Sequence, residues 1–347
     1  MTSGVNELLA STAKIERSHL HWKRPLRAAV VAGVLSTICL AVGAPHAAIP
    51  LVVGAFFTSL ADVADPIGIH WRSMSFTAIW ITFCAFLGGI SSQLGYQELF
   101  VVAIVAFCCG IAGVAGPRAA FNGMVSLVTY TIFAGSPVNI LTNWENTRLV
   151  ALGGVIQIAA FVVPVAIFSP RSLRSAKMAT SPFLTRLRVG FDFSNPFFQH
   201  ALRLVVAMVF ATALADYLHW PHEYWIPMTV AWVSKPDRDG TDYRVVHRFV
   251  GTLAGLLVCF AIINVFGLHA YGHVGLVMVG VFTCLVFVRA NYSLSVVGVT
   301  MLIVALFSLT GDALSQTIHY RTAATAIGCL IAGLAIFVWL AKSPDRG

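Results

Sequence analysis

Charged residues are scarce in this chain. Asp, Glu, Lys and Arg together make up only 10% of its 347 residues, whereas hydrophobic residues make up 58% and the mean hydropathy is +0.83. A water-soluble core of this length does not require so apolar a composition. The scarcity of charge therefore excludes a soluble globular protein and predicts an all-α, polytopic membrane protein, since helices satisfy their own backbone in lipid.

Catalytic and nucleotide-binding motifs are also missing. The chain contains no Gly-Lys pair, which excludes a P-loop for ATP, and it contains neither GxSxG nor HExxH. Its seven cysteines form no CxxC and lie in apolar runs, which favours packing roles over disulfides or a metal cluster. We therefore expect no enzyme activity, no cofactor and no metal site.

Apolar runs separated by polar breaks predict twelve transmembrane spans. They cover residues 25–43, 47–62, 72–92, 98–115, 119–135, 148–169, 199–218, 224–235, 248–266, 272–288, 293–310 and 321–341. With a cytoplasmic N-terminus, all but two of the 22 Lys and Arg residues fall on the cytoplasmic side, as the positive-inside rule requires. The net charge of +8 thus reflects topology and not a nucleic-acid partner. We predict a bacterial inner-membrane protein with both termini cytoplasmic.

One short segment occurs twice. Residues 45–61 read PHAAIPLVVGAFFTSLA and residues 221–235 read PHEYWIPMTVAWVSK, so that Pro50 corresponds to Pro227. About 16 apolar residues reach about 24 Å as a helix, less than the ~30 Å hydrocarbon core. Each copy also carries a proline that is expected to interrupt the helix. Paired short, Pro-interrupted segments indicate the binding site of a transporter.

Further matches extend the duplication along the chain. They pair Leu26-Arg27 with Leu202-Arg203, Arg72 with Arg248, Phe107 and Cys109 with Phe282 and Cys284, Gly123 with Gly298, and Arg148 with Arg321. Because six spans is an even number, the two halves are expected to be parallel and related by a pseudo-two-fold axis along the membrane normal. The predicted parts are a cytoplasmic N-terminal segment (1–24), a first repeat (25–169), a basic interfacial linker (170–198), a second repeat (199–341) and a cytoplasmic tail (342–347). Within the first part, the spacing of Val5, Leu8, Leu9, Thr12 and Ile15 predicts a short interfacial helix, with a disordered tail as the alternative.

The second repeat carries a more specific pattern. Tyr224-Trp225-Ile-Pro-Met-Thr229, followed by Pro236, Arg244, Arg248, Gly251-Thr252 and Gly255, resembles the signature of the fusaric acid resistance and aromatic acid exporter family, which is related to plant aluminium-activated malate transporters. The resemblance covers residues 199–341 and is fainter over 25–169. It implies two six-helix repeats that together move small organic anions, and a periplasmic adaptor protein as a partner of some members.

Two pairs of repeat-equivalent arginines are the candidate anion-binding residues. Arg148 and Arg321 are the two exceptions to the positive-inside count, and Arg72 and Arg248 follow the short segments. A guanidinium stays charged and can grip a carboxylate with two hydrogen bonds. The alternative is that each arginine anchors a helix end in lipid headgroups.

The short segments supply the other candidate substrate contacts. Tyr224, Trp225 and Thr229, with Pro50 and Pro227, are predicted to face an aromatic or aliphatic acid. For the two aromatic residues, membership of the interfacial belt is the competing interpretation.

Proton coupling is assigned to Asp216, His219 and His222 near the outer end of the second short segment. Ordinary surface-loop chemistry is the alternative, and a zinc site at His219, His222 and Glu223 is less favoured because Pro221 intervenes.

These expectations combine into a transporter that exports small organic acid anions, driven by the proton gradient. A passive anion channel and a non-transporting membrane subunit are the alternative functions. The expected partners are a small organic acid anion, membrane lipid, a second copy of the chain and a periplasmic adaptor protein.

Overall fold

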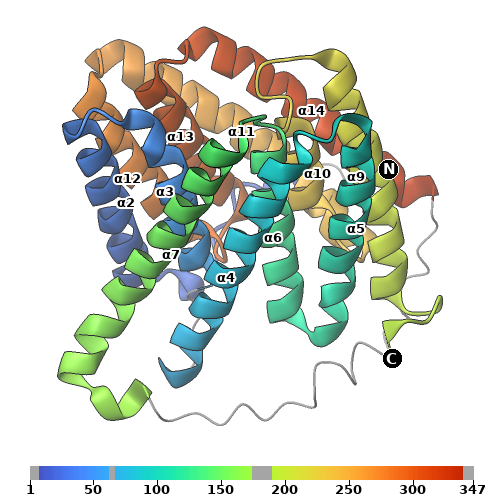
Figure 1. Cartoon of the computed structure of the whole chain (residues 1–347), viewed down its shortest axis with the longest axis horizontal. Helices are drawn as coiled ribbons and strands as arrows, with labels where there is room; N and C mark the ends of the chain where they lie inside the picture. The colour runs from blue at the N-terminus through green and yellow to red at the C-terminus, as the bar shows by residue number, and fades with distance from the viewer. Residues whose placement is uncertain (1–7, 62–66, 174–189, 339–347) are drawn as a thin grey trace. The chain divides into compact units, whose positions relative to one another are not determined.

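The computed structural model describes residues 8–61, 67–173 and 190–338, and the regular structure in these ranges is helical (Figure 1). Nine of the described helices are long and apolar enough to cross a membrane. They are α2 (Lys23–Ala41), α4 (Ile67–Ser91), α5 (Glu98–Ile111, with flanking 3₁₀ turns), α7 (Ile140–Phe168), α9 (Pro196–Leu218), α11 (Arg238–Phe266), α12 (Ala270–Phe287), α13 (Tyr292–Thr310) and α14 (Leu314–Val338). This confirms the all-α membrane fold.

Three further helices occupy the remaining predicted runs. They are α3 (Ala48–Leu60), α6 (Pro117–Ala134) and α10 (Trp225–Val233). At 1.5 Å per residue, α3 and α10 are only about 20 and 14 Å long, and α6 begins with the polar residues Arg118 and Asn122. Each predicted apolar run therefore contains a helix, but only nine of the twelve reach the length and apolarity of a span.

The two prolines of the repeated segment do not interrupt their helices, which corrects the prediction. Pro50 and Pro227 are each the third residue of a helix, α3 and α10 respectively. A proline in the first turn costs little, because the amide hydrogens there have no partner within the helix. The chain is irregular just before each helix, at the 3₁₀ turn η2 (Pro45–Ala47) and at residues 219–224, where His219 and His222 both have positive φ.

The described chain divides into two compact units. Unit 1 comprises Met1–Thr82, Trp144–Lys177 and Val246–Thr322. Within it α2 packs against α3 and α12, and α12 packs against α13; Figure 1 shows α2 beside α12. Glycines let helices of this unit approach closely: Gly54 of α3 faces the carbonyl of Val150, and Gly251 of α11 faces the carbonyl of Ser293. Gly255, one turn further along α11, faces the side chain of Thr300.

Unit 2 comprises Phe83–Asn143, Met178–Val245 and Ala323–Gly347. Within it α9 packs against α5 and α10, and α6 packs against α5 and α10. Helix α9 begins the second predicted repeat, whereas α5 and α6 belong to the first. Unit 1 shows the converse pairing, since α2 comes from the first repeat and α12 from the second. Each unit thus draws helices from both predicted repeats, whose boundaries remain a prediction.

The N-terminal segment is held within unit 1. Residues 8–11 are helical, and the backbone amide of Glu16 donates to the carbonyl of Ala290 (3.0 Å). The ring of His247 lies 2.8 Å from the hydroxyl of Ser11 and 2.9 Å from that of Ser293. Val5 lies outside the described residues, as do residues 174–189 of the predicted linker.

The described end of the linker is aromatic. Phe191 and Phe193 each contact Phe198, and Phe107 of α5 packs edge-on against Phe198 at 5.8 Å. The side chain of Asn195 then accepts a hydrogen bond from the amide of Phe197 (2.9 Å) and caps α9, whose first residue is Pro196.

Candidate functional site

A cavity of about 590 Å³ lies within unit 2, where α6 and α9 end and α5 and α10 begin. Its volume falls in the range of small-molecule sites. Tyr96, Leu99 and Val102 contribute from the start of α5 and the turn before it, Tyr130 and Thr131 from α6, and Tyr224 and Pro227 from the start of α10. The start of the short second segment therefore forms part of the cavity wall.

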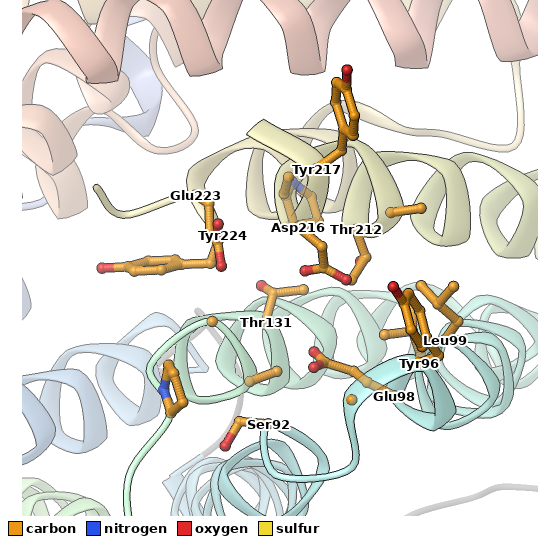
Figure 2. A pocket seen from close by; sticks show the side chains of 18 of the residues that line it. Ser92, Tyr96, Glu98, Leu99, Thr131, Thr212, Asp216, Tyr217, Glu223 and Tyr224 are labelled. Carbon is orange, nitrogen blue, oxygen red and sulfur yellow. The ribbon is translucent and has the colours of Figure 1, made fainter. Parts of the chain in front are cut away.

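Three carboxylates line this cavity: Glu98, Asp216 and Glu223. Figure 2 shows Glu98 on one wall and Asp216 and Glu223 on the facing wall. No Lys or Arg belongs to the lining formed by the described residues, and His219 is its one basic side chain. The cavity is therefore an acidic site.

Helix ends make the carboxylates unequal. Glu98 is the first residue of α5, where the helix dipole favours a negative charge, whereas Asp216 lies in the last turn of α9, where the dipole disfavours it. Glu223, in the loop between α9 and α10, has its pKa raised by burial and then by the charge of Asp216, while His219 acts in the opposite direction. The charge of Asp216 therefore makes ionisation of Glu223 less favourable.

Tyr130 and Thr212 each contribute a hydroxyl group to the cavity wall. The phenol of Tyr130 is buried and donates to the hydroxyl of Ser91 (2.8 Å). The hydroxyl of Thr212 has no hydrogen-bond partner among the described residues, although this side chain is only 6% exposed. By contrast, Thr129 and Thr229 each donate to a carbonyl one turn earlier in their own helices.

Residues of the family-like pattern Tyr224–Thr229 lie partly in the cavity wall and partly in the core. Tyr224 lines the cavity, whereas Trp225 is buried and stacks on His222 at 4.7 Å. Thr229 is fully buried against Gly328, and its hydroxyl bonds to the carbonyl of Trp225 (2.8 Å). The structure thus brings Asp216, His219, Tyr224 and Pro227 together in the cavity lining, to which Trp225, Thr229 and His222 do not belong.

A cluster of basic side chains lies at the opposite end of α10, again within unit 2. This basic group consists of His200 and Arg203 on α9, Lys235 after α10, and Arg244 on α11. Arg203 donates to the carbonyl of Pro236 (2.6 Å), and Arg244 donates to the carbonyl of Trp232 (3.1 Å). One terminal nitrogen of Arg203, Nη1, is buried without a hydrogen-bond partner among the described residues.

Lys235 has an unusual environment within the basic group. Burial, followed by the neighbouring charge of Arg244, lowers its pKa to about 7, and Asp237 only partly offsets this. Its amino group contacts the sulfur of Met124 on α6 at 3.7 Å. Small cavities adjoin the group and are lined by His200, Arg203 and Lys235.

The four predicted arginines all lie in unit 1 and not at the cavity. Arg72 and Arg148 are exposed, and Arg72 lies over the ring of Trp71 at 5.5 Å. Their repeat partners are buried, with 1% exposure for Arg248 and 0% for Arg321. Pro50 is buried at the start of α3 in the same unit. The paired arginines therefore occupy unlike environments.

Sequence reasoning missed Glu98, Thr212, Arg203 and Lys235. Glu98 is an acid at the edge of an apolar run, and Asp216 and Glu223 stand at such edges in the second repeat. Lys235 is the last residue of the repeated segment, and Arg203 is the repeat equivalent of Arg27. Nothing in the sequence marks Thr212, because only the packing of α9 shows that its hydroxyl has no partner.

Comparison with known proteins places the chain among membrane proteins. A family model described as fusaric acid resistance protein-like matches residues 206–335. The uncharacterized protein YhfK of Escherichia coli is 31% identical over 170 residues, covering 49% of this chain and 24% of YhfK. The inner membrane protein YccS of Escherichia coli is 27% identical over 155 residues, covering 44% of this chain and 21% of YccS.

A protein of Neisseria gonorrhoeae, ORF2, is 27% identical over 156 residues, which cover 44% of this chain and 37% of that protein. These alignments thus span roughly a fifth to two fifths of the length of the relatives. No solved structure matches the chain. The chain therefore resembles the fusaric acid resistance protein-like family over residues 206–335, and it is a multi-pass membrane protein.

Proposed function

We propose that this chain is an inner-membrane transporter that exports small organic acid anions, aromatic acids among them, in exchange for protons. The observation that carries the proposal is that unit 2 holds acidic side chains at one end of α10 and basic side chains at the other. The carboxylate-lined cavity lies at the N-terminal end of α10 and the basic group at its C-terminal end. Nine residues of helix separate these ends by only about 14 Å.

The basic group fits the anion side of this exchange. Predicted topology places it towards the cytoplasm, where an anion to be exported would be collected. The unpartnered Nη1 of Arg203 retains a hydrogen-bond donor for a carboxylate, and burying such a donor unpaired is costly. Lys235, with its pKa lowered to about 7, can change charge near neutral pH.

The acidic cavity fits the proton side. Predicted topology places it towards the periplasm, where protons are more abundant. Ionised carboxylates repel an organic anion, so Glu223 and Asp216 would admit one only after protonation. Protonation of these two carboxylates would therefore let the anion leave outward through the cavity as protons enter.

The buried arginines supply a second place for the anion. Arg248 and Arg321 are charged groups held inside unit 1, and charged side chains within membrane helices generally mark ion or substrate pathways. The converse helix pairing in the two units supports the proposed duplication of six-helix repeats about an axis along the membrane normal. The proposal further includes a homodimer and a periplasmic adaptor protein as partners.

The test is export from cells loaded with an aromatic acid. Cells that lack the chain should retain the acid and grow poorly in its presence, and expression of the chain should restore both efflux and growth. Arg203→Ala should abolish the rescue while the protein still reaches the membrane. Full rescue by that variant would exclude the basic group as the anion site.

A passive organic-anion channel is the second candidate. It is favoured by the position of the carboxylates, since Glu98, Asp216 and Glu223 all lie at helix ends or in a loop and not in mid-helix. Recording from planar bilayers separates the two functions. Steady currents far above transporter turnover indicate a channel, whereas flux that follows the pH difference without such currents indicates exchange.

A further inference from the structure

The acidic cavity of unit 2 also has the chemistry of a cation site. Its lining combines three carboxylates with no Lys or Arg among the described residues. Ionised carboxylates only accept hydrogen bonds, so the matching ligand is one that only donates. An ammonium group has this property, since it carries donors and no acceptor.

Thr212 provides an independent sign that this cavity wall binds a ligand. Its side chain is 6% exposed and its hydroxyl has no hydrogen-bond partner within the described part of the chain. Figure 2 shows Thr212 and Asp216 directed from α9 towards the side on which Glu98 lies. A buried hydroxyl is normally satisfied, as it is for Thr131 of the same cavity, which donates to the carbonyl of Val128 (2.8 Å).

The size of the cavity argues for an organic ligand. At about 590 Å³ it far exceeds the space needed for a bare ion. No group of three or more His, Cys, Asp or Glu side chains among the described residues has the arrangement of a metal site. The rings of Tyr96, Tyr130 and Tyr224 line the same cavity and offer apolar surface, as the alkyl part of an amine requires.

We propose that this cavity binds a small organic amine in its ammonium form, with Glu98 and Asp216 holding the charge from opposite walls and Thr212 accepting a further hydrogen bond. Such a ligand shares Asp216 with the protons of the proposed function. The proposal does not depend on that function, because binding can be measured on the purified chain without any transport.

The experiment is calorimetric titration of the purified full chain with putrescine, a four-carbon diamine. The matched neutral probe is 1,4-butanediol, which keeps the carbon chain and replaces both amines by hydroxyls. Putrescine should bind and the diol should not. Glu98→Gln and Asp216→Asn should each weaken putrescine binding about tenfold or more, as loss of a charge-assisted hydrogen bond implies, and Thr212→Val about threefold or more.

Asp239→Asn is the control, because Asp239 is an exposed carboxylate of unit 2 that does not line the cavity. The affinity of this variant for putrescine should equal that of the parent chain. Circular dichroism and gel filtration identify the folded variants, and three independent cavity substitutions leave a test if one of them fails to fold. Absence of putrescine binding to the folded parent chain would overturn the proposal. Equal binding of the diol, or unchanged affinity in the folded cavity variants, would overturn it as well.

Discussion

The side-chain amide nitrogen of Asn291 donates a hydrogen bond to the backbone carbonyl of Lys14 at 2.9 Å and so joins the N-terminal segment to the start of α13. The same nitrogen donates to the carbonyl of Thr12 (2.7 Å), while the side-chain oxygen of Asn291 accepts from the amide of Leu294 and caps α13 (2.9 Å). One side chain therefore performs two separable tasks: it caps a helix with its oxygen and fixes the segment with its nitrogen.

Asn291→Asp separates these tasks. Aspartate retains a cap acceptor but cannot donate to the two carbonyls, so the segment should loosen while α13 stays formed. Loss of two hydrogen bonds of about 1 kcal/mol each predicts at least a fivefold faster amide exchange in residues 8–16. Hydrogen exchange with mass spectrometry measures this. Asn291→Ala should release the segment and also fray α13, and unchanged exchange at residues 8–16 in the aspartate variant would contradict the assigned role.

Helix contact in unit 1 depends on Gly54. A methyl group at this position would overlap the carbonyl of Val150 on α7, and backbone has little freedom to move aside. Gly54→Ala should therefore destabilise the protein by about 1–3 kcal/mol, the usual cost of overpacking. Thermal unfolding in detergent measures the loss. Gly275→Ala in α12 is the matched control, because nothing lies within 4 Å of the added carbon there, and equal melting temperatures for the two variants would refute the close approach.

Stability should depend on pH through Lys235. Its pKa falls from 10.5 to about 7 in the folded chain, so between these values the unfolded chain binds a proton that the folded chain does not. The free energy of unfolding should therefore rise with pH between about 7 and 10.5. Below pH 7 the unfavourable free energy of burying the charged amino group is present in full. Lys235→Met should stabilise the chain at pH 7 and lose that advantage by pH 10. Unfolding at both pH values tests this, with the exposed Lys23→Met as control; a constant advantage across the two pH values would speak against the lowered pKa.

In each pair of repeat-equivalent arginines one residue is buried and the other is exposed, so the exposed residue serves as the control in a transport assay. Arg248 and Arg321 are buried, while their repeat partners Arg72 and Arg148 are exposed. Alanine at either buried position should abolish efflux. Removal of the buried guanidinium leaves the groups around it uncompensated, and its role in the pathway is lost. Alanine at either exposed position should retain most of it. Efflux per membrane-inserted protein is the measurement, and equal losses at buried and exposed positions would show that burial does not distinguish the functional arginines.

Much of the fold follows from sequence because lipid imposes simple rules. Each of the twelve apolar runs contains a helix, as hydropathy and the need for internal hydrogen bonds dictate. The error over Pro50 and Pro227 arose because hydropathy does not locate a helix start: the same proline interrupts a helix in its middle and is tolerated in its first turn.

The site was only partly predictable. Repetition directed attention to the second short segment, and Asp216, His219, Tyr224 and Pro227 do share one cavity. Glu98 joins them from the first predicted repeat because α5 packs against α9, a helix that begins 98 positions further along the chain. Hydropathy and spacing describe single helices, so they do not reveal which helices become neighbours. The unlike burial of Arg72 and Arg248 likewise depends on packing and not on their matched positions.

Transport by the purified chain in proteoliposomes tests the central claim most directly. Uptake of labelled aromatic and aliphatic acids, with benzenesulfonate as an anion that does not cross lipid in a neutral form, is measured with and without a pH difference. The account predicts flux above that of protein-free liposomes, accelerated when protons move opposite to the anion, and lost in Arg203→Ala. Flux no greater than in protein-free liposomes for every acid, with the chain folded and inserted, would contradict it.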